Sequence, residues 1–215
     1  MKKALNNGNT ADSLLMGFPK TLRREVIVVS KLMSLINTSY GCIPYQTEQR
    51  ITVNVMDEII QFPDRVYYLK LSKILIGSLS HTQQIITYCI YTRSNDGYTR
   101  QKAAEKLLNL NKIPYWTLPY IFKLCDEYVI EIIELIAANI NRLDSSEIKM
   151  FVNENKAFLR LGYDRMISYW NCYYRSMYPS IKEYVGYKLY NGHFLIDDKM
   201  ILSEKRSKKE TAADI

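Results

Sequence analysis

Three glutamates spaced by four and then three residues are the first candidates for chemistry: Glu127, Glu131 and Glu134. On one helix, this spacing places three carboxylates on the same face. Such a face binds a basic partner, or it is neutralised by basic side chains of the preceding helix, Arg100 among them. Internal pairing is the favoured interpretation, and exposed pairs stabilise by only ~0–1 kcal/mol each. The stripe has no histidine and no second carboxylate helix, so it predicts no metal site.

The segment Tyr163–Tyr178 (YDRMISYWNCYYRSMY) is dense in tyrosine and arginine. Five of its side chains follow helical spacing and are predicted to form core: Tyr163, Ile167, Trp170, Tyr174 and Met177. Four others lie around the remaining sides: Arg165, Tyr169, Tyr173 and Arg175. Packing of a core with its rim is the favoured interpretation. Exposed tyrosine and arginine also favour binding of a protein, or stacking on unpaired bases with phosphate contacts.

Trp116 lies in a predicted connector just after Pro114. We expect its ring to pack on the first turn of the following helix, although a solvent-facing tryptophan at that turn would be a binding hot spot. The residues expected at a partner surface are therefore Arg100, Trp116, Glu127, Glu131, Glu134, Arg165, Tyr169, Tyr173 and Arg175.

No motif of a known catalytic centre is present. The chain has no P-loop, no glycine-rich dinucleotide turn, no G-x-S-x-G and no nucleophilic Cys–His arrangement. Its four cysteines lie far apart without a C-x-x-C pair, and neither histidine has ligand spacing to a cysteine or to the other histidine. We therefore predict a non-enzymatic protein without a metal or another cofactor.

The beginning of the chain predicts a compartment. Its first residues, MKKALNNGNTADS, are basic but are followed by no apolar run, so they do not predict a signal peptide. No window of 18 residues is apolar and free of charge, so no membrane-spanning helix is expected. The cysteines are then expected to be reduced and mostly buried, and the chain is expected in the cytoplasm.

The net charge of +7 is unevenly distributed. Residues 65–112 hold eight basic and two acidic side chains (+6), whereas residues 113–148 hold two basic and six acidic ones (−4). Alternating signs are typical of packed helices with compensating faces, and a nucleic-acid-binding arm would concentrate one sign.

Periodicity and capping signals predict an all-α protein with about seven or eight helices. The first half is expected to hold an amphipathic helix over 21–37, a short helix over 53–61, another from Pro63 to Gly77, and one after Ser80. A helix over 99–109 is followed by a connector and by a long helix over 118–140, which Thr117 caps. Helical spacing predicts one apolar stripe along this long helix, from Ile121 through Ile132 to Ile140, which Tyr128 widens. Asp144 and Glu147 signal a very long helix over 145–177, which Gly162 bends or divides.

A short helix over 181–190 and a small C-terminal β-hairpin in FLIDDKMIL complete the expected elements. The domain prediction is a flexible segment over 1–18, one helical domain over 19–203 and a charged flexible tail over 204–215.

Five residues in and just before the predicted helix 99–109 follow the pattern D-x-x-x-R-x-x-A-A-x-x-L: Asp96, Arg100, Ala103, Ala104 and Leu107. This pattern resembles the second helix of HEAT and armadillo repeats. The resemblance implies that the aspartate and arginine brace neighbouring units while the alanines allow close helix packing. No repeat period extends across the chain, so we expect an irregular HEAT-like stack of antiparallel helical hairpins.

HEAT-like proteins are mostly scaffolds that bind partners. We therefore expect a non-enzymatic protein-binding scaffold, and a bacterial immunity protein that neutralises a toxin is one concrete form of it. The alternative is a nucleic-acid-binding HEAT-like module, which requires the basic side chains of 65–112 to share one concave face. A DNA glycosylase of HEAT-like fold would use aromatic and acidic residues such as Trp116 and Asp126, but their spacing here defines no motif.

Overall fold

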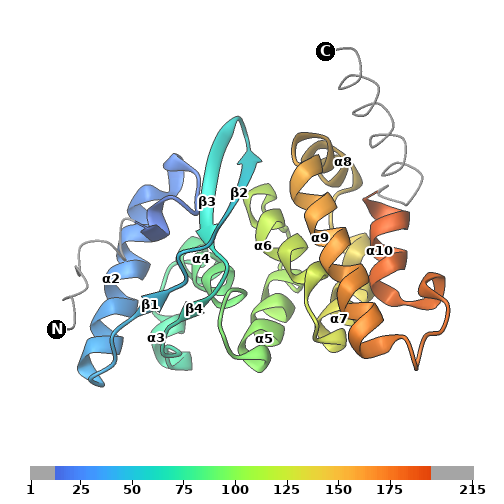
Figure 1. Ribbon diagram of the computed structural model, residues 1–215. Helices are drawn as coiled ribbons and strands as arrows, with labels where there is room; N and C mark the ends of the chain where they lie inside the picture. The colour runs from blue at the N-terminus through green and yellow to red at the C-terminus, as the bar shows by residue number, and fades with distance from the viewer. Residues whose placement is uncertain (1–12, 195–215) are drawn as a thin grey trace, which may run out of the picture.

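The computed structural model describes residues 13–194, which are mostly helical with two small antiparallel sheets. Five helices form a row in which each packs against the next (Figure 1): α2 (Arg23–Ser39), α4 (His81–Tyr91), α5 (Gly97–Leu108), α7 (Ile130–Asn139) and α10 (Val185–His193). Helix α9 (Lys156–Tyr169) packs on α10, and α8 (Ser145–Glu154) packs on α9. The predicted all-α class is confirmed in its helical part, whereas the two small sheets were not expected. Within residues 13–194, no helix combines the length and the apolar character needed to cross a bilayer.

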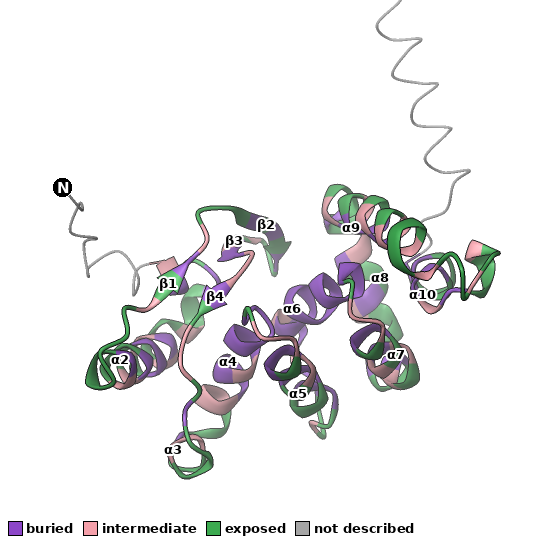
Figure 2. Ribbon diagram, turned by 60° about the horizontal axis from the view of Figure 1, so that its bottom comes forward, coloured by how far each residue is buried: buried purple, intermediate pink, exposed green. Residues whose placement is uncertain are grey.

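Helix α6 (Leu118–Lys123) forms the centre of the core, because all six of its residues are buried. Figure 2 shows it in the middle of the molecule in the colour of buried residues. Thr117 occupies the N-cap position as predicted, but its hydroxyl donates a hydrogen bond to the carbonyl of Pro114 and caps nothing. The short 3-10 turns η2 (Tyr115–Thr117) and η3 (Leu124–Asp126) flank α6.

The prediction of one helix over 118–140 is wrong. The helix ends after η3, Glu127 is extended with ψ 159°, and α7 begins at Ile130. The predicted apolar stripe is nevertheless buried on both sides of the break, at Ile121 as well as at Ile132. Hydrophobic periodicity therefore identified the buried face, but it could not report the interruption.

The predicted short helix over 53–61 is also wrong, because this segment forms a β-hairpin. Strand β2 (Arg50–Val55) pairs with β3 (Glu58–Pro63), and Met56 and Asp57 form the turn with φ of 53° and 63°. Positive φ at both central residues is typical of the two-residue turns whose twist matches that of paired strands. Burial alternates strictly along β2, which is the period of a strand with one covered face. Figure 1 shows the hairpin rising between the α2 end and the α8–α9 end of the row.

The helix predicted from Pro63 to Gly77 is mostly replaced by extended chain. Pro63 ends β3, β4 (Val66–Tyr67) pairs with β1 (Tyr45–Gln46), and only α3 (Lys73–Gly77) is helical. The capping signal after it is confirmed, because Ser80 and Gln83 form a complete capping box at the start of α4.

The helix predicted over 145–177 begins as expected but is divided. Asp144 accepts hydrogen bonds from the backbone of Ser146 and Glu147, which confirms the N-cap of α8. The break falls at Asn155 and not at Gly162. The Asn155 side chain accepts a hydrogen bond from the Asn54 amide (2.7 Å) and donates one to the Asn54 carbonyl (2.9 Å), so it joins β2 to the α8–α9 junction.

The remaining elements close the two ends of the described chain. Helix α9 continues into a π-helical turn, η5 (Trp170–Tyr174), and η6 (Ile181–Glu183) precedes α10. The turn η1 (Lys20–Leu22) precedes α2, and η4 (Ile140–Arg142) follows α7. Leu14 and Phe18 are buried, so the core reaches into the segment 1–18 that was predicted to be flexible. Apart from Phe194, the predicted C-terminal hairpin lies outside the described residues, and so do the tail 204–215 and residues 1–12.

Gly162 lies inside α9 against the hydroxyl of the fully buried Tyr190 of α10, where an added methyl group would overlap that oxygen. We expect Gly162→Ala to lower the free energy of unfolding by about 1–3 kcal/mol, because the packed ring cannot move away. Adding Tyr190→Phe should recover much of this loss, since the next ring atom is 3.3 Å away. Urea denaturation followed by circular dichroism measures both effects.

The matched control is Gly192→Ala in α10, where the new methyl group meets no atom within 4 Å. Equal stabilities of the Gly162 and Gly192 variants would contradict the close approach of α9 and α10.

Candidate functional site

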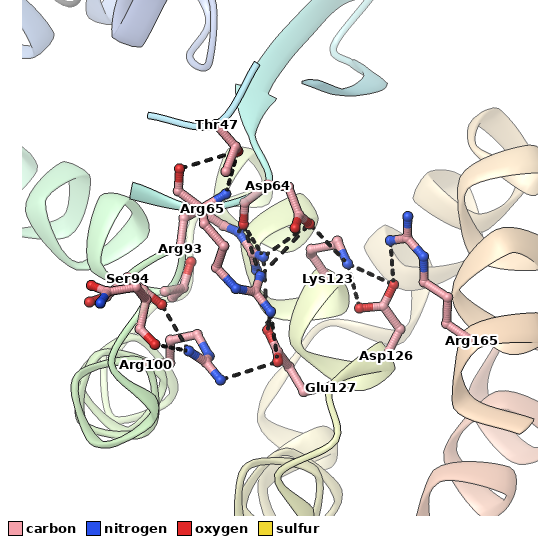
Figure 3. Close-up of polar contacts among 12 residues, drawn as sticks. Thr47, Asp64, Arg65, Arg93, Ser94, Arg100, Lys123, Asp126, Glu127 and Arg165 are labelled. Atoms are coloured by element: carbon pink, nitrogen blue, oxygen red, sulfur yellow. Dashed lines mark hydrogen bonds and ion pairs between the residues drawn. The ribbon is translucent and has the colours of Figure 1, made fainter. Parts of the chain in front are cut away.

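A network of charged side chains lies where the hairpin, α4, α5, η3 and α9 meet (Figure 3). It contains five basic and three acidic residues: Asp64, Arg65, Arg93, Arg100, Lys123, Asp126, Glu127 and Arg165. We call this set the charge network. Most of its side chains are withdrawn from solvent, so each depends on its partners for the stabilisation that water would otherwise provide.

Glu127 is at the centre of the charge network. Its side chain is 1% exposed, and its carboxylate faces three guanidinium groups. Arg65 Nη2 lies 3.0 Å from both of its oxygens, Arg100 Nη2 lies 3.3 Å from Oε2, and Arg93 Nη2 lies 3.8 Å from Oε1. One carboxylate therefore joins the loop after β3, the end of α4 and the first turn of α5.

A second buried pair extends the network toward α9. Lys123 Nζ donates to both carboxylate oxygens of Asp126, at 2.6 and 2.8 Å, and Arg165 Nη1 lies 3.3 Å from Oδ2 of the same residue. Lys123 also lies 3.6 Å from Asp64. Burial raises the pKa of Asp126 above its ordinary value, against the attraction of its two cations. Burial also acts to raise the pKa of Asp64, but the attraction of Lys123, Arg93 and Arg65 outweighs it and leaves that pKa lowered.

Backbone carbonyls fix the arginines of the network. Arg93 donates from Nε and Nη2 to the carbonyl of Asp64, at 3.2 and 2.7 Å. Arg100 donates from Nη1 to the carbonyls of Ser94 and Asn95, at 2.9 and 3.1 Å. Burial lowers the pKa of Arg93 to about 10, so the group still carries its charge at neutral pH. The network therefore fixes loops as well as side chains.

Two residues predicted at the partner surface, Arg100 and Glu127, belong to this interior. Both side chains are 1% exposed, and they pair with each other. The predicted stripe of three glutamates on one helix face is therefore wrong for Glu127, because the chain breaks there and turns its side chain inward. Glu131 and Glu134 are exposed on α7.

Three tyrosine rings gather near the charge network and form what we call the tyrosine surface: Tyr128, Tyr169 and Tyr173. Their ring centroids lie 6.1–6.4 Å apart, and Tyr128 and Tyr173 are 47% and 61% exposed. Tyr169 and Tyr173 were predicted here. Tyr128 was assigned to the apolar stripe of the long helix instead, and no local signal in the sequence shows that the chain breaks beside it.

Tyr174 connects the tyrosine surface to the start of α7. Its hydroxyl donates to the Tyr128 carbonyl (2.6 Å) and accepts from the Ile130 amide (3.3 Å), while its ring stacks on that of Tyr184 at 5.5 Å. Burial, followed by the nearby Glu131, raises the pKa of this hydroxyl, so it remains a donor at neutral pH. The π-helical turn and the start of α7 are thereby locked together.

Two further predicted residues, Glu131 and Glu134, lie near the Tyr174 hydroxyl. Arg165 lies near Tyr169 and is held by Asp126, and Arg175 lies 5.9 Å from the ring centre of Trp170. Trp116 belongs to a different cluster, where its half-buried ring meets Phe18 edge to face at 5.9 Å. This contact is with the segment 1–18, which the sequence predicted to be flexible.

No protein-family model, curated protein or solved structure matches this chain. The fold and the site define a mostly helical protein with a buried charge network and an adjacent exposed tyrosine surface.

Removing the central carboxylate tests the charge network. We expect Glu127→Gln to lower the free energy of unfolding by about 3–5 kcal/mol, because it leaves buried guanidinium groups without their counter-charge. The matched control, Glu131→Gln on the exposed face of α7, should change it by no more than about 0.5 kcal/mol. Urea denaturation of both variants gives the comparison, and similar values for the two would contradict a central role for Glu127.

The pH dependence of stability should report on Asp96, which caps α5 just before Arg100. Hydrogen bonds from the Thr99 hydroxyl and from Lys70 lower its pKa to about 2, below the ordinary 3.8. A lowered pKa in the folded state stabilises above about pH 4, and this contribution is lost as the pH falls toward 2. Asp96→Asn keeps the capping acceptor but has no charge, so its stability should fall less over that range. Asp164→Asn on α9 is the control, and identical pH profiles for wild type and Asp96→Asn would contradict the assignment.

Proposed function

We propose that this chain is a non-enzymatic scaffold that binds another protein through the tyrosine surface. The observation that supports this proposal is a group of three tyrosine rings, of which those of Tyr128 and Tyr173 are exposed, beside a backbone segment that the Tyr174 hydroxyl holds in place. Tyrosine provides a large contact area with a hydroxyl at its end, and it loses little conformational entropy on binding because it has only two rotatable side-chain angles. Clusters of this type are enriched at the energetic centres of protein interfaces.

The surroundings of the tyrosine surface suit a partner with mixed charge. Glu131 and Glu134 offer carboxylates, and Arg165 and Arg175 offer guanidinium groups. Charged groups at the rim of an interface mainly set its specificity and its association rate. The aromatic centre is expected to supply most of the affinity.

The cytoplasm remains the proposed compartment. All four cysteines are free; Cys89 and Cys125 are buried as expected, but Cys42 and Cys172 are exposed, so the expectation of mostly buried cysteines is wrong for these two. Exposed thiols without a disulfide partner persist most readily where the cell keeps thiols reduced. Neutralisation of a toxin by a bacterial immunity protein remains the more specific prediction within this class, and a gene for a toxin domain immediately upstream is the observation that would support it.

The nucleic-acid alternative loses part of its support in the fold. It required the basic side chains of residues 65–112 to share one face, but Arg65, Arg93 and Arg100 are engaged in the charge network. Phosphate contacts by those arginines would require the network to open. The protein-binding proposal needs no such change.

A photo-crosslinking amino acid at position 173 tests the proposal in the native host. We expect one dominant protein adduct there and none at position 40, where Tyr40 is 75% exposed in a different part of the fold. Tyr128→Ala should weaken binding of that partner about 30-fold or more, because it removes a ring from the centre of the contact. Mass spectrometry identifies the adduct. Equal labelling from both positions, or none from position 173, would refute the proposed surface.

A further inference from the structure

A concave site lies between α3, α4 and α5, on elements that take no part in the tyrosine surface. It is a pocket of about 480 Å³. Its walls are the segment 70–71 before α3, the end of α3, one side of α4 and one side of α5. Helix α4 packs against both α3 and α5, and Figure 2 shows α4 and α5 near the middle of the molecule. The volume is within the range of roughly 300–1,000 Å³ that small-molecule sites occupy.

The charged side chains that line this pocket are all lysines: Lys70, Lys73, Lys102 and Lys106. Lys70 is paired with Asp96 at 2.9 Å, whereas the other three have no ion pair with any residue in 13–194. Lys102 and Lys106 are one helical turn apart on α5, so their ammonium groups can approach the same anion. No carboxylate lines the pocket to neutralise the three unpaired lysines. The pocket therefore favours a ligand with several negative charges.

The lining between the lysines is apolar and aromatic. Leu71, Ile76 and Ala103 contribute alkyl surface, and the rings of Tyr88 and Tyr91 come from α4. The Tyr91 hydroxyl accepts a hydrogen bond from the Leu71 amide (2.7 Å) and donates one to the Leu69 carbonyl (3.3 Å), so its ring is fixed. A ligand held only by its charge would leave this aromatic surface uncovered.

The lining also holds polar groups that can form hydrogen bonds with the edge of a heterocyclic ring. Gln84 donates from Nε2 to the Leu79 carbonyl at 2.9 Å, so its side-chain oxygen remains an acceptor. Tyr88 is half-buried, and its hydroxyl forms no hydrogen bond with any residue between 13 and 194. An acceptor and a hydroxyl beside aromatic rings suit a heterocycle with an exocyclic amine.

We propose that this pocket binds a nucleotide, with the phosphates on Lys73, Lys102 and Lys106 and the base against Tyr88 and Tyr91. Several phosphate charges match the unpaired lysines, and bases of any kind stack on aromatic rings. The site is separate from the proposed protein-binding surface, so either assignment can fail without the other.

Calorimetric titration with ATP at low salt tests the site, with adenosine and inorganic tripolyphosphate as partial ligands. We expect saturable ATP binding below about 1 mM, no detectable binding of adenosine, and weaker binding of tripolyphosphate than of ATP. Lys102→Gln combined with Lys106→Gln should weaken ATP binding about tenfold or more. The matched pair Lys182→Gln and Lys188→Gln removes the same charge from exposed sites elsewhere and should change it less than about twofold.

Tyr88→Ala separates recognition of the base from that of the phosphates. It should weaken the binding of ATP but leave that of tripolyphosphate unchanged. The inference is overturned if ATP does not saturate the protein, if both lysine pairs have equal effects, or if tripolyphosphate binds as tightly as ATP. Binding of a single-stranded oligonucleotide that depends on Lys102 and Lys106, without binding of ATP, would also overturn it and would revive the nucleic-acid alternative.

Discussion

The burial of the Glu127 carboxylate among Arg65, Arg93 and Arg100 is the constraint on which much of the architecture depends. Charges removed from water must be paired, and here one carboxylate forms ion pairs with three guanidinium groups that come from three different parts of the chain. To reach them, Glu127 leaves the helical path, and the chain between α6 and α7 breaks at that point. The same pairing fixes the loop after the β-hairpin and the junction between α4 and α5.

The break has a consequence on the outside of the molecule. As Glu127 turns inward, the next residue, Tyr128, becomes half exposed and meets Tyr169 and Tyr173. Asp126, on the other side of Glu127, holds Arg165 one turn before Tyr169. Three consecutive residues thus link the buried charges to the tyrosine surface. Interior contacts therefore position the tyrosine surface, and such preorganisation would favour the protein binding that we propose for it.

Signals that act within one turn of the chain were predictable from the sequence. The caps at Ser80 and Asp144, the helix that contains Arg100 and the buried stripe from Ile121 to Ile136 are present in the structure. The β-hairpin could also have been found, because β-branched residues alternate with polar ones between Ile51 and Val55. Its two-residue turn, Met56–Asp57, lacks the glycine that usually marks a hairpin in a sequence. For the candidate site, the tyrosines and arginines after Tyr163 were identified, but the exposed position of Tyr128 was not.

The sequence by itself determined the mostly helical class, the starts of several helices and the identity of the buried faces, because propensity, capping and periodicity are properties of neighbouring residues. Only the tertiary structure decided where the two longest predicted helices break. Asn155 forms hydrogen bonds with the backbone of β2, and Glu127 pairs with arginines at least 27 positions away in the chain. The same distant pairing decided which charged residues are interior and which are exposed. Buried Glu127 and exposed Glu131 and Glu134 have the same helical spacing in the sequence. Only the position of the basic partners in the folded chain determines which carboxylate is buried.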